Sequence, residues 1–326
     1  MQISWGYAPP LIVQAGVANG VFDALARGPK TVAETGKATG ASPRGLTALM
    51  DALVGLGLLT RDDAGRFSLT PESAAFLVSD SPATLGPFFK QISSKVIPGW
   101  LGINEVVRSG RPPQAMNQEG PGAAFFEDFV ESLFPLNFAG ASALGAHLGL
   151  AQSKKAVSVL DIAAGSGVWS IALAKQSPKV KATAVDWPRV LKVTQKVVER
   201  HGLGSQFRFV GGDILSADFG KGHDVAVLGH ILHTEGEERS RTLLKRVHDA
   251  LGPDGTIVIG EFLADADRRG PPLPLIFAVN MLLHSDCGTT FSYEEIGKFL
   301  AEAGFGETRK LEVPGPSPLI LAKRAR

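Results

Sequence analysis

The second half of the sequence alternates short apolar runs with helical stretches, and this alternation constrains the fold more than any other feature. Runs that favour strands are Val157–Ile162, Ala182–Asp186, Phe207–Val210, Val225–Leu228 and Thr256–Glu261. Helical periodicity marks the stretches between them, such as Val168–Lys175, Val190–Arg200 and Arg239–Ala250. Because parallel strands need crossover helices, the pattern predicts a parallel sheet that is covered on both faces.

The end of the chain adds a helix and two more strands. Glu294–Ala303 has helical character and is followed by Gly304, and Thr308–Val313 and Leu319–Ala322 could pair with each other. The predicted fold class is therefore α/β, a doubly wound and mostly parallel seven-stranded sheet of the Rossmann-like type, over residues 151–326.

Residues 1–80 favour short helices followed by a hairpin. Thr31 and Ser42 are suitable N-caps, and a helical pattern begins near Arg44. Leu59–Arg61 and Arg66–Thr70 flank a polar turn and predict a two-stranded wing. Helices followed by such a wing predict a winged-helix domain.

Residues 81–150 favour helices and are rich in phenylalanine. Pro112–Pro113 and Gly120–Gly122 interrupt the helical pattern and predict loops. Most of the phenylalanines are expected to pack in a core, and a few, among them Phe129, to wall a pocket for an apolar molecule. We therefore expect this segment to be a helical linker and substrate cap.

The overall composition limits the partners of the chain. Its 326 residues carry 33 basic and 32 acidic side chains, so no long-range field would steer it onto nucleic acid or an anionic membrane. A single cysteine fits a reducing compartment, and neither a signal-peptide pattern nor a long apolar run is present. These observations predict a cytoplasmic protein without nucleic-acid or membrane partners.

A glycine-containing turn, Asp161–Gly167, follows the first strand of the predicted sheet. Gly165 and Gly167 allow the backbone to approach a ligand, with Ala163 beside them. The third glycine of a dinucleotide-binding motif is missing, and Asp161 would repel a diphosphate. The acid suits a cationic ligand, such as S-adenosylmethionine (SAM) with its ammonium and sulfonium groups.

Acids at the ends of the next two strands support this interpretation. Asp186 is placed to accept the ribose hydroxyls of an adenosine, and Trp187 could stack on the adenine. Asp213 could accept from the adenine amino group, with Ile214 beside it. The alternative is that these acids only cap the turns or helices that follow them.

Five segments carry a resemblance to one enzyme family: VLDIAAGSGVWSIALA, TAVDWPRVL, FRFVGGDIL, GHILHTEGEERSRTLLKRVHDAL and FAVNMLLHSDCGTTFSYEEIGKFLAEAGF. In these segments, and in the expected winged helix, the chain resembles the two-domain SAM-dependent O-methyltransferases, which include plant caffeate-type and bacterial natural-product enzymes. The resemblance implies a transferase of secondary metabolism that binds SAM, yields S-adenosylhomocysteine (SAH) and forms a homodimer through its N-terminal domain.

The chain departs from the family at several positions. Ala163 and Ala164 replace glycines of the first motif, and Gly229 replaces a lysine that often contacts the cofactor. Thr234 stands where the family has an aspartate after its histidine, and Thr290 stands in place of a glutamate that flanks that histidine.

The resemblance also implies the catalytic residues. His233 corresponds to the general base of the family, and a neutral imidazole suits the removal of a phenol proton near pH 7. Glu261, expected at the end of the neighbouring strand, would orient His233. Met281 and His284 fall on the substrate helix and could line the acceptor pocket.

Other functions remain open from the sequence. N- or C-methylation would need no histidine base, and the strand–turn–helix unit with its acids also suits a NAD-dependent oxidoreductase. A winged-helix regulator that senses SAM is disfavoured because Arg44 is the only base in Ser42–Leu53. His230, His233 and Glu235 lack a convincing metal-ligand spacing, so no metal is expected.

Overall fold

The structure, a computed structural model, describes residues 3–325 and divides into two compact units, residues 1–102 and 103–326. The helices of the first unit are α1 (Ala8–Ala18), α2 (Val21–Leu25), α3 (Val32–Thr39), α4 (Pro43–Gly55), α5 (Pro71–Phe76), α6 (Gly86–Gln91), the π-helical η1 (Ile92–Val96) and α7 (Ile97–Trp100). Its hairpin pairs β1 (Leu59–Arg61) with β2 (Phe67–Leu69) in antiparallel register.

The local signals in the first unit act as the sequence predicts. The Thr31 hydroxyl accepts from the Glu34 amide and Ser42 accepts from Gly45, so both predicted N-caps are confirmed. The hairpin is confirmed as well. Its strands pack on the core of this unit through Leu59 and Phe67.

The second unit begins with helices. They are α8 (Ile103–Ser109), α9 (Glu119–Phe129), the 3₁₀ turn η2 (Val130–Leu133), α10 (Phe134–His147) and a second 3₁₀ turn, η3 (Leu150–Gln152). The glycine- and proline-rich Gly120–Gly122 segment, predicted as a loop, lies inside the first turn of α9. Proline is tolerated there, because the amides of the first turn have no partner within the helix.

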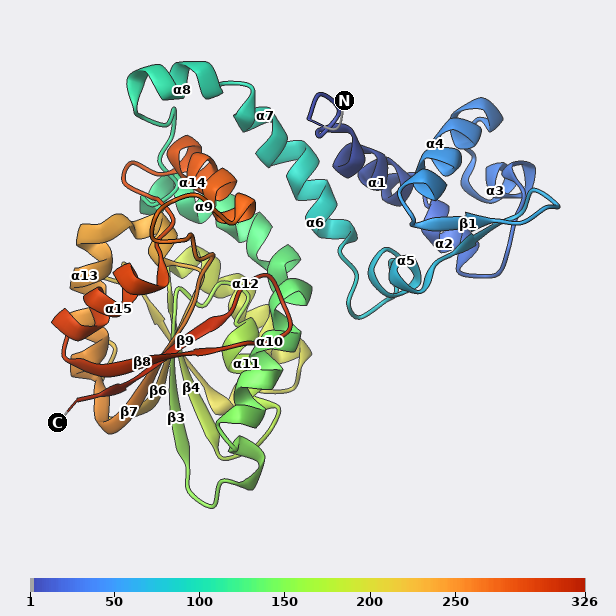
Figure 1. Cartoon of the computed structure of the whole chain (residues 1–326). Helices are drawn as coiled ribbons and strands as arrows, with labels where there is room; N and C mark the ends of the chain where they lie inside the picture. The colour runs from blue at the N-terminus through green and yellow to red at the C-terminus, as the bar shows by residue number, and fades with distance from the viewer. Residues whose placement is uncertain (1–2, 326) are drawn as a thin grey trace. The chain divides into compact units, whose positions relative to one another are not determined.

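A seven-stranded sheet forms the body of the second unit (Figure 1). Its strands are β3 (Val157–Ile162), β4 (Val180–Asp186), β5 (Phe207–Gly211), β6 (His223–Gly229), β7 (Leu251–Gly260), β8 (Phe305–Leu311) and β9 (Leu319–Arg324). The remaining helices are α11 (Val168–Ala174), α12 (Pro188–Arg200), the 3₁₀ turn η4 (Gly204–Gln206), α13 (Leu232–Ala250), α14 (Pro272–His284) and α15 (Tyr293–Glu302).

The strand order is β5-β4-β3-β6-β7-β9-β8, and only β9 runs antiparallel to its neighbours. This confirms the predicted fold class and the terminal strand pair. Two apolar clusters explain why both faces are covered. One joins the sheet to α13 and α15 through residues such as Leu244 and Leu300, and the other joins it to α10, α11 and α12 through residues such as Leu144 and Val197.

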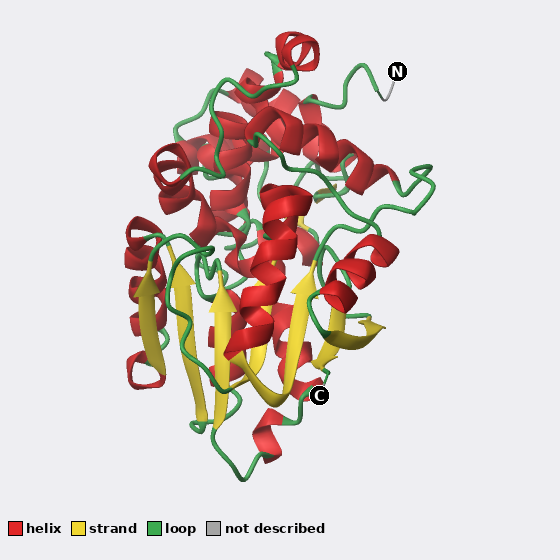
Figure 2. Cartoon of the chain, turned by 90° about the vertical axis from the view of Figure 1, so that its left-hand side faces the viewer, coloured by secondary structure: helices red, strands yellow, loops and turns green. Residues whose placement is uncertain are grey.

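The order of the strands reverses direction at β3, which lies between β4 and β6. Ligands of such sheets bind beyond the carboxyl ends of the strands at this point. The parallel strands end at one common edge, as Figure 2 shows. The candidate residues Asp161, Asp186, His233 and Glu261 lie at or directly beyond these strand ends.

Within residues 3–325, no helix combines the length and the apolar character that crossing a bilayer requires.

Candidate active site

The turn after β3 has the backbone of a ligand-binding loop. Gly165 and Gly167 have φ values of 55° and 74°, in the left-handed region that favours glycine. Ala163 also has a positive φ, 54°, which costs an alanine about 1 kcal/mol or more. The strained alanine and the two glycines bend the chain at the edge where a ligand is expected.

Asp161 lies beneath this turn and is fully buried. Its Oδ2 atom accepts from the Ser170 amide (3.2 Å) and the Ser170 hydroxyl (2.5 Å), whereas Oδ1 has no partner among residues 3–325. Burial raises the pKa of Asp161 to about 7, although the Ser170 hydrogen bonds lower it. A buried carboxylate with an unpartnered oxygen favours a nearby cation.

Asp186, at the end of β4, accepts a hydrogen bond from the same turn. Its Oδ2 accepts from the Gly165 amide (2.8 Å) and its Oδ1 from the Trp187 amide (2.7 Å). Burial raises its pKa to about 6 against these two hydrogen bonds. The structure therefore brings Asp161, Gly165 and Asp186 together, as the sequence predicts for one cofactor site.

Trp187 packs against the helices before the sheet. Its ring joins a small apolar cluster with Ala123, Val130 and Val190, and it lies so close to Gly122 of α9 that any larger residue there would clash. This contact supplies a reason for the tryptophan other than stacking on adenine.

The acid after β5 is held in a different way. Asp213 accepts from the Leu215 amide (2.7 Å), and its Oδ2 atom lies 3.5 Å from the Arg239 guanidinium. Asp213 thus caps the turn that follows it and also faces the positively charged guanidinium of Arg239. Ile214 is buried in the core beneath it.

His233 and Glu261 form a buried polar pair at this edge. Nδ1 of His233 lies 2.7 Å from Oε2 of Glu261, and the His233 amide donates to Oε1 over 3.2 Å. Both are buried, at 7% and 2% exposure. The pair arises because β6 and β7 are neighbours and each residue follows its strand within a few positions.

The electrostatics of the pair favour an ionised glutamate. Burial by itself raises the pKa of Glu261, but the charge and hydrogen bonds of His233, with a contribution from His230, hold it below its ordinary value. Burial lowers the pKa of His230 to about 4, so that ring is neutral at pH 7. His230 also has a positive φ of 63°, and its Nε2 atom lies 2.9 Å from the Ser317 hydroxyl.

Aromatic rings surround His233. The Phe277 ring of α14 stands edge-on to the imidazole at 5.0 Å between centroids, and Phe262 lies 6.2 Å away. These two rings contact each other at 4.6 Å. The imidazole therefore lies against an apolar wall that limits the access of water.

The predicted pocket residues lie on two helices of the same unit. Met281 is buried on α14, one turn beyond Phe277. The His284 ring lies 6.4 Å from Phe125, which in turn lies 5.1 Å from Phe129 at the end of α9. His284 donates from Nδ1 to the Asn280 carbonyl, which leaves the lone pair on Nε2.

Two of the departures from the family have local explanations. A side chain at Gly229 would collide with the Trp169 indole, at 2.0 Å from its Nε1 atom, so this position has no room for the lysine that the resemblance implies. Thr290 is buried and donates to the Pro274 carbonyl, and thus anchors the start of α14. The backbone carbonyl of Thr234 accepts from the Ser285 hydroxyl, a contact that does not depend on the threonine side chain, so this departure has no structural explanation.

Some residues of the site were not predicted from the sequence. Phe277 precedes Met281 by four positions and His284 by seven, a helical spacing that could have identified it. Phe262, Ser170 and Arg239 contact predicted site residues through the tertiary fold, and no sequence pattern pointed to them.

The arrangement fits a cationic adenosine cofactor. The unpartnered Oδ1 of Asp161 suits a positive group, and carboxylates stand at the ends of β4 and β5, where an adenosine is expected. A diphosphate would face the carboxyl groups of Asp161 and Asp186 at this turn.

Comparisons with known proteins agree with this arrangement. The O-methyltransferase domain family matches residues 141–306, and the O-methyltransferase dimerisation domain matches residues 1–79. The tetracenomycin polyketide synthesis 8-O-methyl transferase TcmO of Streptomyces glaucescens is 30% identical over 94% of this chain and 90% of its own length. The 3-hydroxy-5-methyl-1-naphthoate 3-O-methyltransferase of Streptomyces sahachiroi is also 30% identical, over 93% and 87%.

Solved structures show the same fold. A protein described as a candidate O-methyltransferase from Nostoc punctiforme has a TM-score of 0.88 at 25% identity, over 99% of this chain and 97% of that one. Human N-acetylserotonin methyltransferase in complex with SAM has a TM-score of 0.83 at 24% identity, over 100% and 96%. The chain belongs to the SAM-dependent O-methyltransferase family.

Proposed function

We propose that the enzyme transfers the methyl group of SAM to the hydroxyl of a small aromatic acceptor, with His233 as the general base. The observation that carries the proposal is the buried hydrogen bond between His233 and Glu261 at the edge of the sheet that holds the cofactor loop. An oriented imidazole in an apolar site is what deprotonation of a phenol requires.

Asp161, Asp186 and Asp213 would hold SAM. Asp161 would offer a negative charge to its cationic end, Asp186 would accept hydrogen bonds from the ribose hydroxyls, and Asp213 would accept one from the adenine amino group. Ala163, Gly165 and Gly167 shape the loop around it, and Trp187 and Ile214 complete the apolar surroundings. When bound, SAM supplies a methyl group that its sulfonium has already activated, so the protein mainly positions the acceptor and removes a proton.

The proton path follows from the hydrogen bond. Because Nδ1–H of His233 donates to Glu261, the lone pair of the neutral ring is on Nε2. Nε2 would take the acceptor proton as the oxygen is methylated, and the ionised Glu261 would stabilise the imidazolium that results.

The acceptor is proposed to be an aromatic alcohol. Phe262 and Phe277 offer flat apolar surfaces beside His233, and Phe129, Met281 and His284 lie on the helices around the expected pocket. The tetracenomycin and naphthoate enzymes are named for aromatic substrates, which agrees with such a pocket. Secondary metabolism is the expected setting.

The proposal extends to organisation and location. Residues 1–80 would form a winged-helix domain that makes the enzyme a homodimer, residues 81–150 the linker and substrate cap, and residues 151–326 the SAM-binding catalytic domain. Helices α2, α3 and α4 and the hairpin that follows them support the first assignment. Balanced charge and a single cysteine agree with a cytoplasmic enzyme without nucleic-acid or membrane partners.

A transfer assay with labelled SAM tests the proposal. The matched acceptors 1-naphthol and 1-naphthylamine present one ring system with a hydroxyl or an amine. Methylation of the naphthol, lost in His233→Ala, supports O-methylation with a histidine base. Preferential methylation of the amine, insensitive to His233→Ala, would favour N-methylation instead. Thermal stabilisation by SAH but not by NAD would separate both from an oxidoreductase.

A further inference from the structure

Helix α13 is broken immediately after the residues that carry the proposed base. Gly236 has φ 68° and ψ −178°, a conformation that is not helical and is almost confined to glycine. The break separates a first turn, Leu232–Glu235, from the regular helix that follows. The first turn therefore needs contacts other than the helix to hold His233 in place.

Glu235 and Arg239 join the two parts across the break. Nε of Arg239 donates to Oε2 of Glu235 over 2.6 Å, and the Glu235 side chain is almost fully buried. The Ser240 hydroxyl donates to the Leu232 carbonyl and adds a second link. Burial raises the pKa of Glu235, whereas the Arg239 hydrogen bond and charge lower it. The guanidinium is thus the compensating partner of a buried acid.

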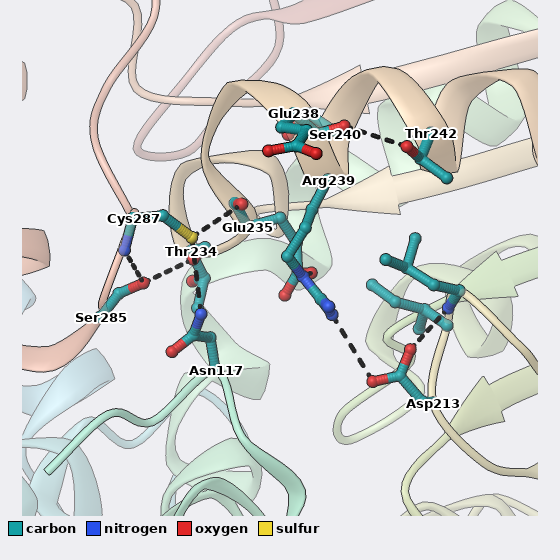
Figure 3. Close-up of polar contacts among 12 residues, drawn as sticks. Asn117, Asp213, Thr234, Glu235, Glu238, Arg239, Ser240, Thr242, Ser285 and Cys287 are labelled. Carbon is teal, nitrogen blue, oxygen red and sulfur yellow. Dashed lines mark hydrogen bonds and ion pairs between the residues drawn. The ribbon is translucent and has the colours of Figure 1, made fainter.

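The Arg239 guanidinium also contacts Asp213, the acid that follows β5. An Nη atom of Arg239 lies 3.5 Å from Oδ2 of Asp213, and Oδ1 of Asp213 accepts from the Leu215 amide (Figure 3). Each of the two oxygens of Asp213 therefore has its own hydrogen-bond partner. Glu235 fixes Arg239, and Arg239 faces the acid proposed to bind adenine.

The far side of the first turn is held by the segment after α14 (Figure 3). The Ser285 hydroxyl donates to the Thr234 carbonyl over 2.7 Å, and the Cys287 thiol donates to the Glu235 carbonyl over 3.1 Å. The Thr289 amide donates to the His233 carbonyl. Three hydrogen bonds from residues 285–289 thus hold the turn, which makes Glu235 an anchor for Arg239.

We infer that Arg239 is a positioning residue that orients the Asp213 carboxylate toward the adenosine end of SAM. Glu235, in the turn that carries His233, anchors Arg239. The inference rests on the proposed function, because it takes Asp213 as a cofactor ligand. It assigns to this chain a cofactor-orienting pair, Glu235–Arg239, in addition to the loop and the strand-end acids.

Two variants distinguish whether Arg239 orients Asp213 or only compensates the buried charge of Glu235. Arg239→Met leaves the buried Glu235 without a partner and should lower the melting temperature and weaken SAH binding. The double variant Glu235→Gln, Arg239→Met removes the buried charge as well, so its melting temperature should recover. Its Kd for SAH, measured by calorimetry, should stay raised about fivefold, because Asp213 still lacks its guanidinium. The KM for SAM should rise similarly, and kcat should change less than twofold.

A matched control lies on the same helix. Arg241 pairs with Glu237 four positions earlier and also contacts Glu302, away from Asp213. Glu237→Gln, Arg241→Met should leave the Kd for SAH at the wild-type value. Asp213→Ala serves as the reference for loss of the acceptor itself and should weaken SAH binding at least as much as the Glu235/Arg239 double variant.

Each outcome decides the inference. Recovery of both melting temperature and SAH affinity in the Glu235/Arg239 double variant would show that Arg239 only compensates a buried charge, and would overturn it. Unchanged affinity in Asp213→Ala would overturn it together with the placement of adenine, while leaving methyl transfer intact. Failure of the wild-type enzyme to bind SAH would instead refute the proposed function.

Discussion

Nδ1 of His233 lies 2.7 Å from Oε2 of Glu261, and the two residues are 28 positions apart in the chain. Adjacent strands bring them together, because Gly229 at the end of β6 pairs with Gly260 at the end of β7. The sheet, and not a local motif, thus builds the proposed base and the carboxylate that orients it.

Glu261→Gln should lower turnover while keeping one of the two hydrogen bonds that Glu261 accepts from His233. The amide oxygen can still accept from His233, but the negative charge that stabilises an imidazolium is lost. We expect kcat to fall by about tenfold or more and the acidic limb of its pH profile to move to lower pH. An unchanged profile would remove Glu261 from the mechanism.

Asp186→Ala should weaken cofactor binding strongly. The carboxylate holds the Gly165 and Trp187 amides and is proposed to accept the ribose hydroxyls, so alanine both loosens the loop and removes the acceptor. Calorimetry with SAH should show a Kd raised on the order of a hundredfold. Wild-type affinity would mean that the cofactor lies elsewhere.

Asp161 should make stability fall as the pH rises. Its folded-state pKa is raised to about 7 from an ordinary value of 3.8, so its favourable contribution is complete below pH 3.8 and is lost as the pH rises through 7. Asp161→Asn should flatten this dependence and stabilise the ligand-free protein at pH 8 by at least about 1 kcal/mol. Denaturant titrations at several pH values measure the free energy of unfolding of the wild type and of Asp161→Asn. The same dependence on pH in both proteins would contradict the prediction.

Gly236→Ala should be severely destabilising. An added Cβ would lie 2.3 Å from the Cys287 carbonyl oxygen, in a backbone conformation that alanine avoids. We expect the free energy of unfolding to drop by about 3 kcal/mol or more. Gly202→Ala is the matched control, since Gly202 also has a positive φ but would meet nothing within 4 Å. Its cost should be about 1 kcal/mol, and equal losses in the two variants would argue against the clash.

The fold could be predicted largely from the sequence because its signals are local. Strand β3 has the predicted bounds, and the other strands of the parallel sheet differ by a few residues. Strand β7 begins earlier than expected, at Leu251, because His223 on β6 pairs with it before a bulge. Tertiary pairing overrides the local pattern here, since Pro253, Asp254 and Gly255 lack the apolar character of a strand.

The candidate site was less predictable, because its contacts are made between distant segments. The strand-end acids, Glu261 among them, followed from topology, and His233 followed from the family resemblance. The packing of Trp187 against α9 and the contact of Arg239 with Asp213 each join segments whose proximity only the fold determines. The break at Gly236 also lies inside a stretch whose composition favours a continuous helix.

The central claim, that His233 removes the acceptor proton, is tested most directly by single-turnover methyl transfer from SAM to 1-naphthol in wild type and His233→Ala. If 1-naphthol is an acceptor, the rate of transfer should fall by about 10²–10⁴-fold in the variant, with the Kd for SAH unchanged. An unchanged rate, at equal SAH affinity and melting temperature, would contradict the assignment of His233 as the base.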